Sequence, residues 1–189
     1  MQEARSASGQ QRVAFVAHSA GGWLSRVWMQ AHGGLDGIEA IVTLGSPLRP
    51  PPTDVPGVID QTRGILSYVD ANCPSPADVA KAGGRFVCIA GKYIHGTEVL
   101  SPENLNAWVV GQGYRQVCGD GAVWGDGITP TQWALLPGAE HVELDGVFHT
   151  PVGAGPGPWY GSPGVLDLWV HHLGGTATTP SQPASSAAS

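Results

Sequence analysis

The sequence predicts an α/β fold in which a mostly parallel sheet is flanked by helices. Three observations support this prediction. A short apolar run at residues 12–17 ends in small polar residues and reads as a buried strand. Residues 20–32 follow with apolar side chains at helical spacing, and a second apolar run occupies residues 38–44. A strand, a helix and a strand in this order favour parallel pairing through a right-handed crossover.

The remaining elements continue the pattern of alternating strands and helices. Further apolar runs at residues 85–90 and 139–144 predict two more buried strands. Residues 58–69 and 76–82 are expected to form short helices, and residues 165–173 a closing helix.

Two kinds of sequence fall outside this pattern. The glycine-rich residues 91–125 are expected to form an insertion or lid with little regular structure. Residues 1–11 are a polar lead, and the Ser/Thr/Ala/Pro-rich residues 174–189 predict a disordered tail. One domain is therefore expected at residues 12–173.

Composition limits the classes of protein that need to be considered. The 189 residues are enough for one sizeable core, and 42% of them are hydrophobic. A formal net charge of −6 argues against a nucleic-acid-binding surface. The sequence has no apolar run of the roughly 18 residues that a membrane-spanning helix needs.

The three cysteines, Cys73, Cys88 and Cys118, do not match a zinc-binding spacing. Cys88 lies in an apolar run and is expected to be a buried small hydrophobe. The sequence leaves open a disulfide between Cys73 and Cys118. No phosphate-binding loop is present, and we expect no metal or organic cofactor.

The feature that carries chemistry is the segment Ala17-His18-Ser19-Ala20-Gly21-Gly22, between a predicted strand and a predicted helix. A nucleophilic serine on such a turn is crowded by its own backbone, and small residues two before and two after it relieve the crowding. Ala17 and Gly21 occupy these places, although the first is more often glycine. The turn also places the N–H of Ala20 where it can donate to a developing oxyanion. The alternative is that Ser19 only caps the helix.

A serine nucleophile needs a base, and His149 is the best of the seven histidines. It follows a predicted strand and enters a loop, as a base beyond the carboxyl end of a sheet should. His141 begins that strand, at the wrong edge of the sheet. His171 and His172 are expected to be surface residues of the terminal helix. His18 is adjacent to the serine, which should point its side chain elsewhere.

The base in turn needs a carboxylate, which in this order of the chain lies between the serine and the histidine. Asp126 is flanked by glycines that permit a tight loop, and we predict that it is the acid. Asp120 has the same flanking glycines and is its rival. Asp145 is only four residues from His149 and is less suitable. The alternative for Asp126 is an ordinary Asp-Gly turn.

Five segments resemble plant and algal α/β-hydrolases grouped with the GPI inositol-deacylase and lipase-like families. They are AHSAGGW, TLGSP, VWGDGITP, LDGVFHTPVG and PWYGSP, and the resemblance spans residues 12–173. It implies an α/β-hydrolase fold with Ser19, Asp126 and His149 as the catalytic triad. It also implies an ester-cleaving activity directed at small-molecule esters or lipids, GPI inositol deacylation among them.

The sequence departs from this group in one respect. The fold implied by the resemblance has several strands before the nucleophile strand, and here only about a dozen residues precede it. The region that is not present would supply the second oxyanion N–H and a strand beside residues 13–17. We therefore expect the C-terminal part of a larger hydrolase, with an apolar unpaired strand edge at residues 13–17.

Three interpretations follow from the sequence. The first is a serine esterase or lipase-like hydrolase, the second a non-catalytic relative that binds a ligand or a protein, and the third a fragment that does not fold alone. Plastid and cytoplasm both remain open as compartments. Four aromatic residues are expected either to line an acyl-binding lid or to pack the core: Trp108, Tyr114, Trp124 and Trp133.

Overall fold

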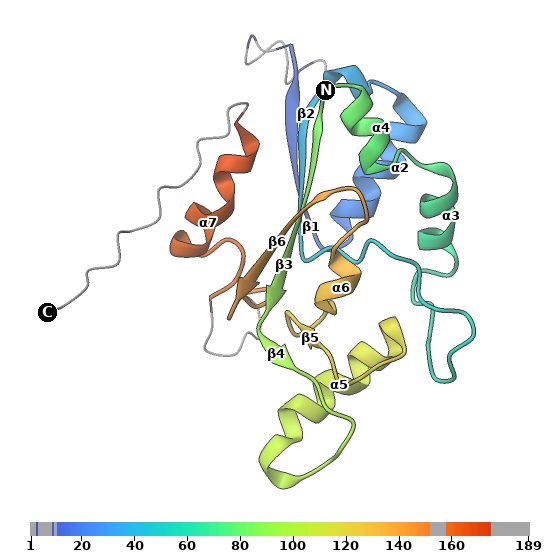
Figure 1. Cartoon of the computed structure of the whole chain (residues 1–189), viewed down its shortest axis with the longest axis vertical. Coiled ribbons are helices and arrows are strands. Elements are labelled where there is room, and N and C mark those ends of the chain that lie inside the picture. The colour runs from blue at the N-terminus through green and yellow to red at the C-terminus, as the bar shows by residue number, and fades with distance from the viewer. Residues whose placement is uncertain (1–2, 4–8, 10, 152–157, 175–189) are drawn as a thin grey trace, which may run out of the picture.

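A computed structural model describes residues 3, 9, 11–151 and 158–174, and its centre is a four-stranded parallel sheet (Figure 1). The strand order is β1-β2-β3-β6, and every neighbouring pair in this sheet is parallel. The strands are β1 (Val13–His18), β2 (Ile38–Leu44), β3 (Arg85–Lys92) and β6 (Glu140–Asp145).

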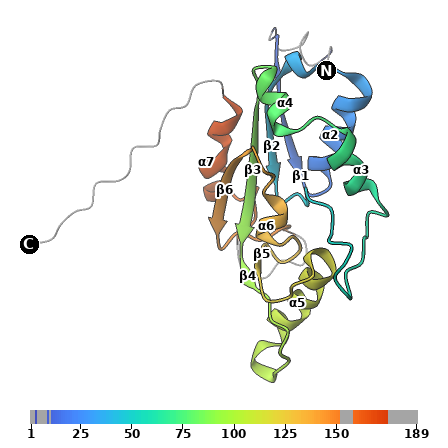
Figure 2. The ribbon, with the colours of Figure 1, turned by 45° about the vertical axis from the view of Figure 1, so that its right-hand side comes forward.

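Helices cover both faces of the sheet, as Figures 1 and 2 show. On one face lie α2 (Gly21–His32), α4 (Pro76–Lys81) and α6 (Thr131–Ala134), with α3 (Ile65–Asn72) packed against α2. On the other face lies α7 (Pro163–Trp169), continued by the 3₁₀ helix Val170–Leu173. The predicted mostly parallel sheet flanked by helices is thus confirmed.

The core forms two layers because successive strand residues point to opposite faces of the sheet. Ile41 and Cys88 pack with α2, α4 and α6, whereas Val42 and Val87 pack with α7. All four side chains are fully buried, which explains why β2 and β3 read as continuous apolar runs. The prediction that Cys88 is a buried small hydrophobe is confirmed.

The expectation of little regular structure in residues 91–125 is wrong. This segment holds the 14-residue helix α5 (Leu105–Cys118) and a small antiparallel pair, β4 (Ile94–His95) with β5 (Trp124–Gly125). One of the two glycines within α5, Gly111, allows a close contact of the helix. A Cβ on Gly111 would lie 2.8 Å from the backbone nitrogen of Thr97, so only glycine allows the helix to approach that strand end.

Two smaller expectations are also wrong in part. The helix predicted at residues 58–69 starts later, at Ile65, after a turn in which the Asp60 carboxylate accepts the N–H groups of Thr62 and Gly64. His172 is buried, not on the surface, and its Nδ1 lies 3.3 Å from a carboxylate oxygen of Glu140. Burial lowers the pKa of His172.

The cysteines and the termini complete the comparison with the sequence. The structure has Cys73 and Cys118 as buried free thiols, with no disulfide between them. The predicted tail at residues 174–189 lies outside the described residues from position 175 on, as does most of the lead at residues 1–11. Among the described residues, no helix is both long enough and apolar enough to cross a bilayer.

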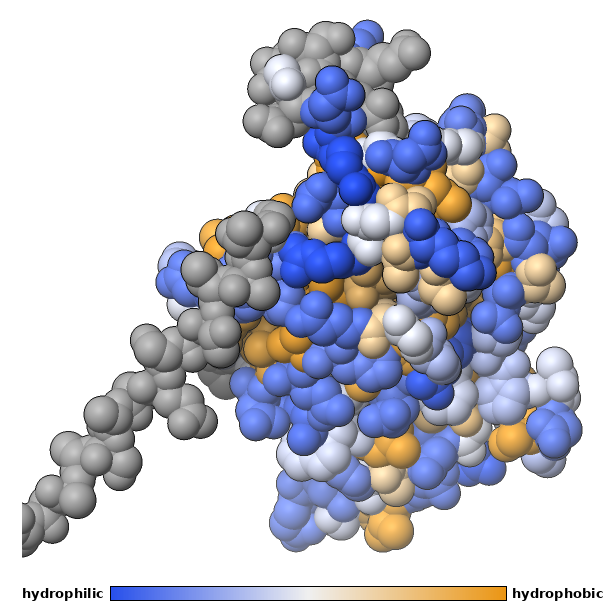
Figure 3. All heavy atoms as spheres, turned by 45° about the horizontal axis from the view of Figure 1, so that its top comes forward, coloured by the Kyte–Doolittle hydropathy of each residue, from blue (hydrophilic) through white to orange (hydrophobic). Residues whose placement is uncertain are grey.

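Strand β1 forms one edge of the sheet. As expected, β1 pairs only with β2 among the described residues, and Val16 on this edge strand is 49% exposed. The face seen in Figure 3 carries mostly hydrophilic residues with small hydrophobic groups between them.

Helix α2 is held against α3 by a buried guanidinium. Arg26 is only 1% exposed, and its Nε donates to the carbonyl of Pro74 at 2.9 Å. Its Nη2 donates to the carbonyls of Val69 and Cys73 at 3.2 and 3.3 Å. These acceptors are carbonyl groups of the last turn of α3 and of the two residues that follow the helix. Arg26 therefore fixes the helix that follows Ser19.

Arg26→Met should lower the free energy of unfolding by about 2–3 kcal/mol, because three buried carbonyls lose a charged donor. The measurement is urea unfolding followed by circular dichroism. Arg63→Met makes the same chemical change at an exposed position and should stay within about 0.5 kcal/mol of the parent. Equal losses in the two variants would refute the proposed role of Arg26.

Candidate active site

Ser19 lies at the junction of β1 and α2 with a backbone φ of 54°. This left-handed conformation is uncommon for residues other than glycine and stores strain. Its N–H donates to the carbonyl of Leu44 at 3.0 Å, which ties the turn to the end of β2. The side chain thereby projects from the carboxyl end of the sheet, where sites of open parallel sheets lie.

The steric constraint on this turn falls mainly on Gly22. A Cβ on Gly22 would lie 2.5 Å from the Cβ of Ser46, whose hydroxyl donates to the carbonyl of Ala17 at 3.2 Å. A Cβ on Gly21 would meet only the Cβ of Ala17, at an ordinary 3.5 Å. The sequence predicts crowding between positions 17 and 21, but the close approach is one residue further on, at Gly22.

His149 lies within hydrogen-bond distance of both predicted partners. Its Nε2 is 3.1 Å from Oγ of Ser19, and its Nδ1 is 2.7 Å from Oδ2 of Asp126. A carboxylate accepts, so Nδ1 carries the proton and the neutral ring leaves Nε2 free to accept from the serine hydroxyl. The imidazole is 5% exposed and is therefore largely shielded from water. The structure brings all three predicted residues together.

Asp126 is 1% exposed, and its carboxylate is fully engaged. Oδ1 accepts the N–H groups of Ile128 and Thr129 at 3.0 and 2.7 Å, within its own turn. Oδ2 accepts from His149 and from the hydroxyl of Tyr160 at 2.9 Å. The backbone N–H of His149 also donates to the carbonyl of Asp126, so the acid loop and the base loop are joined twice.

Tyr160 is a part of this arrangement that the sequence argument did not find. Its hydroxyl donates to Asp126 and accepts the N–H of Gly91 at 2.7 Å. Burial, reinforced by the negative charge of Asp126, raises the pKa of Tyr160 well above its ordinary value, so the hydroxyl stays protonated. The segment PWYGSP drew attention to this region, but no local pattern indicates contact with a residue 34 positions away.

The prediction that the side chain of His18 points away from the site is wrong. Its Nε2 donates to the carbonyl of His149 at 2.8 Å, and the two rings lie 4.7 Å apart. Burial lowers the pKa of His18, and the hydrogen bond to the carbonyl of His149 opposes this effect in part. His18 thus supports the loop that carries His149.

The two carboxylates that rival Asp126 in the sequence have other partners. One backbone N–H next to Ser19 also remains available as a hydrogen-bond donor. Among the described residues, the N–H of Ala20 has no hydrogen-bond partner. The carboxylate of Asp120 accepts the N–H of Ala122 beyond the end of α5, and Asp145 lies 3.7 Å from the ammonium of Lys92. The described part of the chain has no cluster of three or more His, Cys, Asp or Glu side chains suited to a metal ion.

Comparison with known proteins gives one family match and one informative structural match. A sequence model described as the PGAP1-like alpha/beta domain matches residues 2–66, which include β1, the Ser19 turn and β2. The crystal structure of Bacillus licheniformis lipase BlEst2 in its mature form superposes with a TM-score of 0.52 at 22% sequence identity. The two chains share a fold. The chain therefore has the same α/β fold as this lipase, with a mostly parallel sheet flanked by helices.

Neither match covers the whole of this chain. The structural match covers 78% of this chain and 62% of the lipase chain. Comparison with curated protein sequences gives no match.

Gly22→Ala should lower the free energy of unfolding by about 1–3 kcal/mol, because the added methyl overlaps Ser46 in a packed turn. Gly21→Ala is the matched control, and it should stay within about 1 kcal/mol of the parent since its methyl finds room. Chemical denaturation of both variants measures the difference. A more destabilised Gly21→Ala would show that the constraint has been placed at the wrong glycine.

Tyr160→Phe should lower the free energy of unfolding by about 1–2 kcal/mol, because the N–H of Gly91 and one lone pair of Asp126 lose a buried partner. Tyr68, which is 54% exposed, allows the same substitution without a comparable loss. Thermal and urea unfolding of the two variants give the comparison. No difference between them would mean that the Tyr160 hydroxyl contributes nothing to the network.

Proposed function

We propose that this chain is a serine hydrolase that cleaves carboxylic esters through an acyl-enzyme, with Ser19 as nucleophile, His149 as base and Asp126 as acid. One observation carries the proposal: an unbroken hydrogen-bonded line runs from Oγ of Ser19 through the imidazole of His149 to the buried carboxylate of Asp126. Nucleophile, base and orienting carboxylate in this geometry form the arrangement that nucleophilic acyl transfer needs.

The positions of the protons on Ser19 and His149 determine the steps of the proposed reaction. Oγ of Ser19 attacks the ester carbonyl while Nε2 of His149 takes the hydroxyl proton. The imidazolium gives that proton to the departing alkoxide, which leaves as an alcohol, and the acyl group stays on Ser19. Water then attacks the acyl-enzyme, His149 removes its proton, and the carboxylic acid leaves as the serine hydroxyl is restored. Asp126 holds the ring tautomer and stabilises the imidazolium.

Charge developing on the carbonyl oxygen needs a donor that is already in position. The N–H of Ala20 is assigned this role because it follows the nucleophile, begins the turn into α2 and has no partner among the described residues. The lipase whose fold this chain shares, together with the match to the PGAP1-like domain, supports an ester or lipid as the substrate.

A fluorophosphonate probe, together with hydrolysis of p-nitrophenyl butyrate, tests the proposal on the full chain. The parent should be labelled and active. Ser19→Ala should abolish labelling, and His149→Gln or Asp126→Asn should reduce the rate by about 10³- to 10⁴-fold, because the serine loses its base or the base loses its orientation.

Two matched variants separate catalysis from general damage. Asp120→Asn changes the rival carboxylate with identical glycine neighbours. His141→Gln changes a histidine of β6 whose Nε2 is hydrogen-bonded to the carbonyl of Leu136. Both should keep roughly the parent's rate. If the folded parent neither reacts with the probe nor hydrolyses the ester, the proposed enzyme activity is wrong, and a ligand- or protein-binding relative is the better interpretation.

A further inference from the structure

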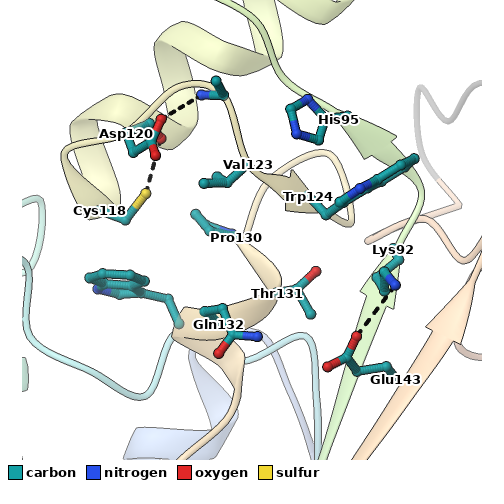
Figure 4. Close-up of a pocket in the computed structure, with 12 residues that line it drawn as sticks. Lys92, His95, Cys118, Asp120, Val123, Trp124, Pro130, Thr131, Gln132 and Glu143 are labelled. Carbon is teal, nitrogen blue, oxygen red and sulfur yellow. Dashed lines mark hydrogen bonds and ion pairs between the residues drawn. The ribbon is translucent and has the colours of Figure 1, made fainter.

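A second candidate site is a cavity of about 560 Å³ lined by residues on both sides of Asp126 in the chain, among them Trp124 and Pro130 (Figure 4). The ends of β3, β4 and β6 form one side, and the end of α5, the segment leading into β5, and α6 form the other. None of Ser19, Asp126 and His149 lines it. Its volume is within the range of small-molecule sites, about 300–1,000 Å³.

The wall of this cavity is mostly apolar and includes an open aromatic side chain. In the view of Figure 4, Val123 and Pro130 lie between Asp120 on one side and Trp124 on the other. The indole of Trp124 is 47% exposed, and the ring of His95 meets it edge-on with 5.4 Å between ring centroids. This contact braces the indole without burying it, so the ring remains available to a ligand.

The charges around the cavity do not balance. The cavity is lined by one ammonium group, that of Lys92, and by the carboxylates of Glu143 and Asp120. The ammonium of Lys92 lies 3.6 Å from a carboxylate oxygen of Glu143 and 3.7 Å from one of Asp145, which lies outside the lining. The carboxylate of Asp120 accepts the N–H of Ala122 at 2.7 Å and makes no ion pair with any described cationic side chain. The rim is therefore negative, as is the whole chain at −6.

We propose that this cavity binds an organic cation, a quaternary or alkyl ammonium group with a small apolar body. The indole of Trp124 receives the ammonium, because tryptophan has the most favourable ring face for a cation. The surplus carboxylate charge of Asp120 and its neighbours attracts the same group, and Val123 and Pro130 contact its carbon atoms. An anion is disfavoured because Lys92 is already matched. The site does not depend on the proposed esterase activity.

Choline and its uncharged carbon analogue 3,3-dimethylbutan-1-ol are the probes, since they share shape and differ in charge. Titration of the full chain is followed by the indole ¹H–¹⁵N resonances, with that of Trp124 identified from a Trp124→Phe sample. Choline should shift the Trp124 resonance with saturation, and the neutral analogue should bind at least about tenfold more weakly. Equal binding of the two probes, or shifts confined to other tryptophans, would overturn the proposal.

Asp120→Asn should weaken choline binding by about 2- to 5-fold, as expected for one carboxylate in a solvated site. Asp36→Asn makes the same change at an exposed position in the 3₁₀ helix Leu35–Gly37, away from the cavity, and should leave binding unchanged. If the two substitutions weaken choline binding equally, the effect comes from the net charge of the protein, and the proposed site is refuted. Trp124→Leu, checked for folding by circular dichroism, should abolish the charge preference.

Ser19→Ala separates this proposal from the esterase. The variant should lose probe labelling and bind choline as the parent does. Loss of choline binding in Ser19→Ala would place the cation in the serine site and overturn the second cavity as its location. If the parent is inactive but still binds choline at Trp124, the proposed esterase activity is wrong and the proposed cation site is supported.

Discussion

The buried carboxylate of Asp126 is the constraint on which the rest of the site depends. A carboxylate that is 1% exposed is tolerated only when its oxygens find donors, and here four donors come from three separate parts of the chain. Two belong to its own turn, one to the loop after β6, and one to the segment before α7. Satisfying this one group therefore fixes the positions of His149 and Tyr160 relative to the sheet.

The parallel sheet makes that convergence possible. β1, β3 and β6 all end at the same edge, so the residues that follow them meet although they are far apart in the chain. The strained turn at Ser19 adds the last component, since the serine leaves the strand at a positive φ and its hydroxyl lies within hydrogen-bond distance of Nε2 of His149. Packing at Gly22 and the anchoring of α2 through Arg26 hold that turn in place.

The same loop has two sides with different chemistry. Asp126 faces the buried network, whereas Trp124, two residues earlier, opens on a second cavity with a negative rim. The antiparallel pair of β4 and β5 turns the chain between these two surfaces, and the N–H of Tyr93 secures it to the carbonyl of Gly125. A glycine-rich stretch that reads as an irregular lid is in fact the support for both surfaces.

The sequence alone was sufficient to predict the features that depend on residues close together in the chain. Apolar runs and helical spacing predicted the four strands of the main sheet and α2, and small residues around Ser19 predicted its sharp turn, because these signals act over a few residues. It could not assign roles to Tyr160 or His18, or detect α5 among its glycines, since those depend on contacts between distant segments. Asp120 and Asp126 show the limit most clearly. Both stand between glycines in the sequence, and only the tertiary structure decides that Asp126 lies beside His149 while Asp120 faces a separate cavity.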